Sequence, residues 1–210
     1  MKAWHFVRAN KQLGYGDNRI VQVGQTYRYE GKEPIELCKR GMHGSVKIMD
    51  ALKYAEGNII CRVELSGDII HGDDKVVATE RKVLAMIDGE KVLRKFACMC
   101  ALDVIHLWDA HEIVVRYLKT QDESIRHEAR AAAWYSARAT SAWAALATSA
   151  AWDSALASAS AARDSALASA SAARTARTAR DAWAREAWEA WAKLNARLTR
   201  MVNKAIKGGR

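Results

Sequence analysis

The stretch NIICRVELSG, residues 58–67, is the clearest structural signal in this sequence of 210 residues. It is rich in β-branched residues, apolar and polar side chains alternate after Ile60, and Gly67 follows as a terminator. This pattern predicts a half-buried β-strand. The stretch DKVVATERKVLAMI, residues 74–87, fits either a strand or a helix, and we interpret it as a strand that leads into a turn at Asp88 and Gly89.

The residues before this pair of strands show the same β-rich, glycine-punctuated character. AWHFV (residues 3–7) and RIVQVGQTYRY (residues 19–29) are strand candidates, and LGYGDN between them is typical of a turn. VKIMDALKYAEG (residues 46–57) predicts a helix, because Ile48, Leu52 and Ala55 share one helical face. Residues 1–88 are therefore expected to form a small β-rich head domain.

The hydrophobic period changes from two to that of a helix after Gly89. EKVLRKFACMCALDVIHLW predicts a helix with a mostly apolar face, and AHEIVVRYLKT predicts a second, shorter one, so residues 89–120 are interpreted as connecting helices. Thr120 and Glu123 have the spacing of a capping box that would open a third helix. The members of the first helix's apolar face are Val92, Phe96, Met99, Cys100, Asp103 and Leu107.

Residues 121–210 form an alanine-rich tail. Between Ser124 and Lys207 there is neither glycine nor proline, and 31 of these 84 residues are alanine, the best helix former. The eleven-residue unit DSALASASAAR occurs twice in succession, which keeps a seam of small side chains on one helical face. This composition predicts a continuous helix of about 125 Å, packed as a hairpin or coiled coil. Disorder is the competing interpretation. Its last turns carry an apolar stripe of Leu194, Leu198, Met201, Val202 and Ala205.

Indole rings punctuate this small-residue tail. They either fill gaps in a helical hairpin or against the head domain, or they are exposed anchors for a protein partner. The candidate partner-binding residues are Trp134, Trp143, Trp152, Trp183, Trp188 and Trp191.

The net charge of +9 belongs mainly to the second half of the chain, where residues 124–207 carry 13 basic and 6 acidic residues. Such a bias indicates either a solvated helical face or electrostatic binding of nucleic acid by the tail. No apolar run is long enough to span a membrane, and no leader-like segment opens the chain. We therefore expect a cytoplasmic protein whose four cysteines are free thiols.

The most site-like stretch is CKRGMHGS, residues 38–45. Arg40, His43 and Ser45 surround two glycines, so cationic side chains and backbone amides are available to an anionic ligand. The alternative is a tight connection ahead of a helix. No phosphate-binding loop, nucleophile elbow or zinc-type spacing occurs, so the sequence predicts no metal site, no resident cofactor and no catalytic residue.

Four elements carry a family resemblance that extends over almost the whole chain. They are Gly24 with Tyr27, the residues of CKRGMHGS, the helix DALKY and the strand VELSG. With them the chain resembles an uncharacterised domain family of bacteriophage and prophage genomes, whose motif is C-x-x-G-[LM]-H-x-S. The stretch VLRKFACMCALDVIHLW and the Ala/Trp/Arg-rich tail ending in LNARLTRM are similar to chains described as immunity proteins.

A second likeness is to the ADP-ribosyltransferase core, in which a strand of the form G-x-H-x-S precedes a helix. Arg40, His43 and Ser45 match this pattern loosely, and NAD would be the implied ligand. Glu64 and Glu80 lack the surroundings of the catalytic glutamate in that core, so the implied transfer chemistry has no acidic residue to carry it.

These observations favour an α+β protein with a β-rich head, two helices and a long alanine-rich helix. We expect a phage- or prophage-encoded interaction protein with an immunity or anti-defence role. It would bind a host or toxin component or associate with itself. The alternatives are a nucleotide-binding or ADP-ribosyltransferase-like head domain and a tail that binds nucleic acid.

Overall fold

The computed structural model describes residues 1–14, 17–107, 109–139 and 180–209. The chain divides into two compact units. Unit 1 consists of Met1–Gly89 together with the residues from Leu198 on, and unit 2 lies within Glu90–Arg197. The structure confirms the expected mixed α+β class, with an antiparallel sheet first and helices after it.

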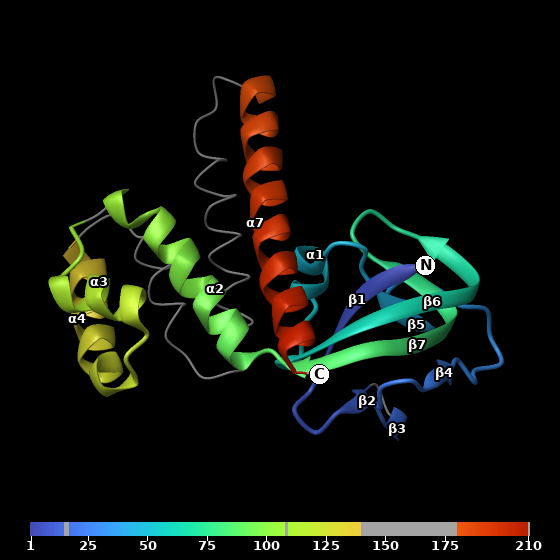
Figure 1. The fold of residues 1–210 in the computed structure, drawn as a ribbon. Coiled ribbons are helices and arrows are strands. Elements are labelled where there is room, and N and C mark those ends of the chain that lie inside the picture. Colours follow the sequence, from blue (N-terminus) through green and yellow to red (C-terminus); the bar gives the residue numbers. More distant parts are fainter. Residues whose placement is uncertain (15–16, 108, 140–179, 210) are drawn as a thin grey trace. The chain divides into compact units, whose positions relative to one another are not determined.

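Two long strands form the centre of unit 1 (Figure 1). β6 (Ile59–His71) and β7 (Val76–Asp88) pair in antiparallel register along almost their whole length. Both sequence predictions of a strand here are confirmed, but β6 continues four residues beyond Gly67. Gly67 makes this continuation possible, because its φ of +77° lies in the left-handed region and a Cβ there would stand 2.0 Å from Thr79 Oγ1.

The remaining strands attach to this pair, and β1 (Lys2–Val7) confirms the expected strand at AWHFV. β1 pairs with β6, whereas β4 (Thr26–Arg28) and β5 (Met42–Gly44) both pair with β7, and all of these pairs are antiparallel. β2 (Gln12–Gly14) and β3 (Asp17–Ile20) form a separate two-stranded sheet. Residues 19–29 are thus split between β3 and β4 rather than one strand, and Gly24 between them has a φ of +88°.

Alternation along the strands sorts the side chains of unit 1 onto two faces. One face carries a contiguous apolar cluster contributed by β1, β4, β5, β6 and β7. α1 (Ile48–Leu52) packs against β1 and is buried at every position. It is shorter than the helix predicted for residues 46–57, ending where Lys53 and Tyr54 turn back to bond the carbonyls of Asp50 and Ala51.

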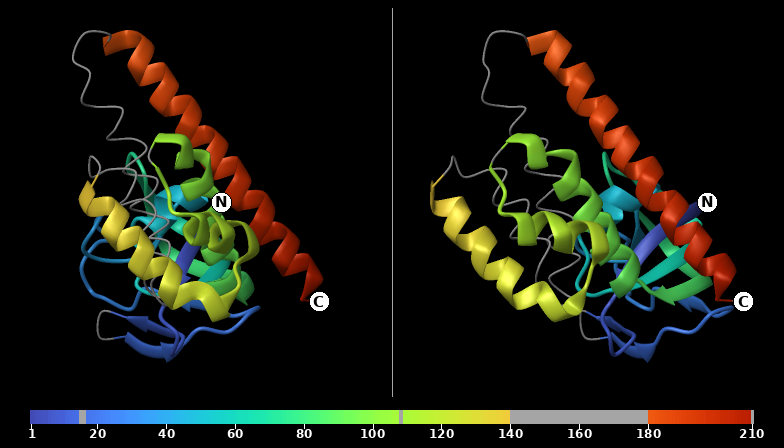
Figure 2. Two further views of the ribbon diagram at one scale, coloured as in Figure 1. Left: turned by 90° about the vertical axis from the view of Figure 1, so that its left-hand side faces the viewer. Right: turned by 60° about the vertical axis from the view of Figure 1, so that its left-hand side comes forward.

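Unit 2 is helical in its described part (Figure 2). α2 (Glu90–Asp103) packs on α3 (Glu112–Thr120), and α3 packs on α4 (Arg126–Ala139), with the short turns η1 (Ile105–Leu107) and η2 (Glu123–Ile125) between them. The two predicted connecting helices are therefore confirmed. Its fully buried residues include Leu93, Phe96, Cys98, Val114, Tyr117 and Leu118.

The predicted capping box at Thr120 and Glu123 is wrong. Thr120 Oγ1 instead donates to the Arg116 carbonyl at 2.8 Å, which completes α3. Asp122 is the capping residue, because its carboxylate accepts from the Ser124 amide at 2.9 Å. The carboxylate of Glu123 forms ion pairs with Arg94 and Arg126 instead of capping the helix.

The tail is described at its two ends only. α4 and α7 (Arg180–Gly208) are helical, as predicted, and the eleven-residue repeat lies outside the described residues. The predicted stripe near the C-terminus is confirmed by burial: Leu198 and Val202 are fully buried, while Leu194, Met201 and Ala205 are half-buried. No described helix is long and apolar enough to cross a membrane.

A truncation within β6 tests the importance of the central strand pair. Leu65 is fully buried, so Leu65→Ala is expected to lower the free energy of unfolding by about 2–5 kcal/mol through lost burial and a residual cavity. The matched control is Ile70→Ala in the same strand, where the side chain is 40% exposed and the change should stay within about 1 kcal/mol. Urea denaturation followed by circular dichroism measures both, and equal losses would contradict the assignment.

Candidate ligand-binding cleft

A cleft of about 640 Å³ lies in unit 1. Residues of β1, the β2–β3 hairpin, the loop from Cys38 to Ser45, the end of α1 and the strand β7 line it. This volume is within the range of about 300–1,000 Å³ that is usual for small-molecule sites. Arg40, His43 and Ser45, the three predicted ligand-binding residues, all lie on its wall.

Arg81 is the unusual residue of the cleft. It stands on β7 opposite Leu65 and Tyr27, so its side chain shares a face with an apolar cluster and is only 4% exposed. Its Nη1 donates to the His43 carbonyl at 2.8 Å, whereas its Nε has no hydrogen-bond partner. The described part of the chain provides no carboxylate in ion-pair contact with this guanidinium. Burial lowers the pKa of Arg81 to about 10, which leaves it charged at neutral pH.

His5 on β1 lines the same cleft near Arg81. Its pKa lies well below the ordinary value, first because the ring is surrounded by protein, and then because the charges of Arg81 and His43 oppose protonation. The imidazole is therefore neutral at pH 7. The neutral ring adds no charge that offsets the Arg81 guanidinium, and the carboxylate of Asp17 stabilises that guanidinium without forming an ion pair with it.

His43 fastens the loop that it belongs to. Its Nδ1 lies 3.1 Å from the Gly41 carbonyl, and its Nε2 accepts from the Cys38 amide at 3.1 Å, which assigns the proton to Nδ1. Burial lowers the pKa of His43, although the bond to Gly41 opposes this. Gly41 has a φ of +113°, and a Cβ at this position would stand 2.5 Å from Cγ2 of Val77. The ring thus fixes the backbone carbonyl that holds Arg81.

Arg40 and Ser45 also have their polar partners within the protein. Arg40 donates to the Pro34 carbonyl at 3.2 Å and pairs with the carboxylates of Glu33 and Glu36. Ser45 is 2% exposed and exchanges two backbone hydrogen bonds with Trp4, at 2.8 and 2.9 Å. The structure therefore brings the three predicted residues together, while the charge of Arg40 is neutralised within its own loop.

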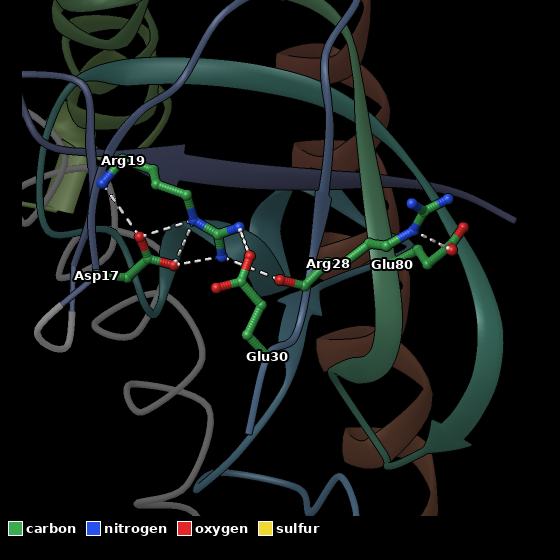
Figure 3. Close-up of polar contacts among 5 residues, drawn as sticks. All are labelled: Asp17, Arg19, Arg28, Glu30 and Glu80. Carbon is green, nitrogen blue, oxygen red and sulfur yellow. Dashed lines mark hydrogen bonds and ion pairs between the residues drawn. The ribbon is translucent and has the colours of Figure 1, made fainter. Parts of the chain in front are cut away.

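Arg19 is the cation that holds the β2–β3 hairpin to the rest of the unit (Figure 3). Its guanidinium bonds both carboxylate oxygens of Asp17, pairs with Glu30 at 2.7 Å and donates to the Arg28 carbonyl at 3.0 Å. The Arg28 side chain pairs separately with Glu80 on β7. Although Arg19 lines the cleft, its charge is balanced by these carboxylates, so the network serves to position the cleft wall.

Lys75 and Tyr54 form a second polar group on the wall. The Lys75 ammonium lies 3.7 Å from the centre of the Tyr54 ring, and the Tyr54 hydroxyl donates to Asp74 at 2.8 Å. Burial lowers the pKa of Lys75, but hydrogen bonds with the Cys38 thiol and the Tyr54 hydroxyl raise it by more, so the amine stays charged. No described carboxylate forms an ion pair with this amine.

The cations of the cleft can be sorted by their partners. Those of Arg8, Arg19, Lys39 and Arg40 each contact a carboxylate. Arg81 and Lys75 are the two lining cations for which the described residues provide none. Sequence reasoning missed both, because TERK in the middle of β7 reads as a solvated stretch, and because Lys75 follows a turn-like GDD.

The predicted partner-binding tryptophans lie elsewhere in the chain. Trp188 on α7 is 63% exposed, and Trp191 is half-buried. Trp134 and Trp183 lie on α4 and α7, and Trp143 and Trp152 lie outside the described residues. Their assignment to partner binding stays a prediction.

Comparison with known proteins gives one match. Residues 1–95 match the sequence model of a family described as a domain of unknown function (DUF7666). The matched range contains all the strands of the described residues together with α1, and therefore the whole cleft. The search of curated proteins finds no match to the chain, and the search of solved structures finds none either.

The two depressed histidines predict a dependence of stability on pH. Because the folded-state pKa values of His5 and His43 lie below the unfolded value of about 6.5, the unfolded chain binds more protons as the pH falls through 6.5. The free energy of unfolding should therefore decrease between pH 7.5 and pH 5, by at most about 1.4 kcal/mol per pH unit and histidine.

Two variants assign this effect. His5→Asn should reduce the pH dependence measured by urea denaturation at several pH values and leave the part that His43 contributes, because it removes one of the two titrating rings. His71→Asn, which replaces an exposed histidine at the end of β6, should leave the slope as it is in the unmodified protein. A slope that is unchanged in His5→Asn would contradict the role given to His5.

Proposed function

We propose that unit 1 is a ligand-binding domain whose cleft takes a small organic anion of the nucleotide class. The observation that carries this proposal is Arg81, a nearly buried guanidinium with an unpartnered Nε and no described carboxylate in ion-pair contact. Removing such a charge from water costs several kcal/mol unless an opposite charge or hydrogen-bond acceptors compensate. A phosphate group provides both, because it is anionic and offers several acceptor oxygens.

The surroundings of Arg81 favour a ligand with an uncharged, flat part as well as an anion. The rings of Tyr29 and Tyr54 lie on the wall of the cleft, where they offer apolar surface to a base or sugar. Tyr54 is held by Asp74 and Lys75, so its orientation is set before a ligand arrives. Such prior order reduces the entropy lost on binding.

The proposal concerns binding and includes no transfer step. Glu64 and Glu80 do not line the cleft, and Glu80 pairs with Arg28. The carboxylates that do line it, Asp17, Glu30 and Glu56, are each paired with an arginine. The likeness to the ADP-ribosyltransferase core is thus compatible with NAD as a member of the ligand class, without supplying a catalytic acid.

Calorimetry with a panel of NAD, AMP, ADP and GMP tests the proposal. At least one of these ligands is expected to release or absorb heat, and Arg81→Met should weaken its binding by about 10- to 100-fold, the value of a charge-assisted hydrogen bond. The variant is expected to remain folded, because replacing a buried ion with an apolar side chain of similar volume is often neutral or stabilising. Its melting temperature provides the check.

Arg28→Met is the matched control for this experiment. Arg28 also stands on a strand that pairs with β7, but its side chain is exposed, pairs with Glu80 and does not line the cleft. Its replacement should leave the affinity unchanged. Absence of heat with every ligand, or equal losses in the two variants, would overturn the proposal.

A second candidate function is binding of a protein partner through α7, supported by the exposed indole of Trp188. This is the interaction role, with its phage, immunity and self-association aspects, that the sequence led us to expect, and it stays a prediction. Binding of nucleic acid by the basic tail also stays a prediction, since much of that tail lies outside the described residues. Neither role competes with the cleft for the same residues.

A further inference from the structure

We propose that Cys38 is a thiol modification site on the wall of the cleft, where it exchanges with small disulfides that carry carboxylate groups. This inference goes beyond nucleotide binding, because it assigns a covalent and reversible reaction to a residue that the binding proposal does not use. It rests on the accessibility of the thiol, on the charge beside its sulfur and on the unpaired guanidinium in the same cleft.

Accessibility separates Cys38 from the other cysteines, all four of which lie in the described residues. Cys38 is exposed, whereas Cys61, Cys98 and Cys100 are buried. Burial raises the pKa of these three thiols to about 12, 11 and 12 respectively, which keeps them protonated and unreactive at neutral pH. A reagent in solution therefore meets the thiol of Cys38 first.

The backbone and side chain of Cys38 are both held in place. Its φ of +66° is a left-handed conformation, and its amide donates to His43 Nε2. The Lys75 ammonium lines the same cleft and lies 3.7 Å from the centre of the Tyr54 ring, and hydrogen bonding to the Cys38 thiol contributes to its raised pKa. The positive charge of Lys75 can therefore stabilise the negative charge of the Cys38 thiolate, or that of the thiolate that leaves.

Arg81 supplies the independent indication that an anion enters this region. It is more than nine-tenths buried, its Nε is unpartnered, and it lines the cleft to which Cys38 belongs. A chain of contacts links the two residues, because Arg81 bonds the His43 carbonyl and the His43 ring bonds the Cys38 amide. Together with Lys75, this guanidinium favours a disulfide whose substituents are anionic over one whose substituents are cationic.

The reaction is a thiol–disulfide exchange. The Cys38 thiolate attacks one sulfur of the incoming disulfide, the S–S bond of the reagent breaks, and a new S–S bond joins Cys38 to half of it. The other half leaves as a thiolate and takes a proton from water. The disulfide itself is the oxidant, and the product carries its carboxylate into the cleft, where it would occupy the place of an anionic ligand.

Two disulfides of similar size and opposite charge test this assignment. The full-length reduced protein is treated with 3,3′-dithiodipropionate, a dianion, or with cystamine, a dication, and each rate is divided by that of a neutral reference thiol. The normalised rate at Cys38, followed by mass spectrometry of the intact and digested protein, is expected to be about fivefold or more higher for the dianion, the effect of one unit charge at close range in water. Cys38→Ser should form no adduct.

The source of the preference is tested at Lys75. Lys75→Gln removes the ammonium on the side of the sulfur and should bring the two normalised rates closer together, with Arg81 as the remaining source of the preference. Lys39→Gln is the matched control, because Lys39 adjoins Cys38 in sequence but is paired with Glu36 at 2.7 Å, so the preference should persist. Equal rates in the unmodified protein, a preference that Lys75→Gln leaves intact, or adducts on the buried cysteines would each overturn the assignment.

This result is separable from the nucleotide experiment, which uses the reduced protein and measures reversible binding. Charge-selective labelling of Cys38 without any nucleotide heat would overturn the proposed function and leave the thiol site standing. Nucleotide binding without charge-selective labelling would overturn the thiol site and leave the proposed function standing. If both hold, a saturating nucleotide should slow the labelling of Cys38, since the ligand and the reagent would occupy the same cleft.

Discussion

The antiparallel pairing of β6 with β7 is the constraint on which unit 1 depends. Each strand has 13 residues, and their register shifts at two places along the pair. β1 adds to the outer edge of β6, and β4 and β5 add to β7, so every other strand of the main sheet is positioned by one of these two. The register also decides that Arg81 faces Leu65 and Tyr27 instead of solvent.

Burial of Arg81 turns this sheet into a candidate binding site. A guanidinium among apolar side chains would be expected to carry a carboxylate partner, as the guanidinium groups of Arg8, Arg19 and Arg40 on the cleft wall do. Here the protein supplies one carbonyl oxygen, from His43, and the loop that presents it is stapled by the same residue's ring. The polar groups of that loop therefore organise the cleft. The charge that they leave without an ion pair is that of Arg81, which is also the least exposed to solvent.

The distribution of partners is the reason that an anionic ligand is proposed for the cleft although acidic residues surround it. Arg19, Lys39 and Arg40 on the cleft wall contact carboxylates close to them in sequence, and Arg8 contacts Glu56. Such pairs contribute little energy while fixing geometry. Arg81 and Lys75 differ from them: Arg81 is nearly buried, the Lys75 ammonium lies against the Tyr54 ring, and neither forms an ion pair with a described carboxylate. The exposed thiol of Cys38 lies beside one of them, whereas the other three thiols are shielded by packing.

Much of the fold was readable from local pattern. Alternation predicted β1, β6 and β7, the helical period predicted α2 and α3, and the stripe ending in Ala205 predicted which face of α7 is buried, because these signals depend only on neighbours in sequence. CKRGMHGS was likewise recognisable as a candidate site from its glycines and cations, and its residues line the cleft. Three details were not readable from local pattern: the C-terminal limit of β6, the capping role of Asp122 and the hydrogen bond by which Thr120 belongs to α3. Each depends on a contact that competes with the one that the local sequence suggests.

The sequence by itself thus determined the class of the protein, the order of its elements and one wall of the cleft. Only the tertiary structure decided which charge in that cleft is available to a ligand. TERK shows four polar residues in a row, and nothing in those letters distinguishes Arg81, which is buried, from Glu80 and Lys82, which are not. That distinction arises from strand register across distant segments, because a shift of one residue would move Arg81 to the opposite face of the sheet.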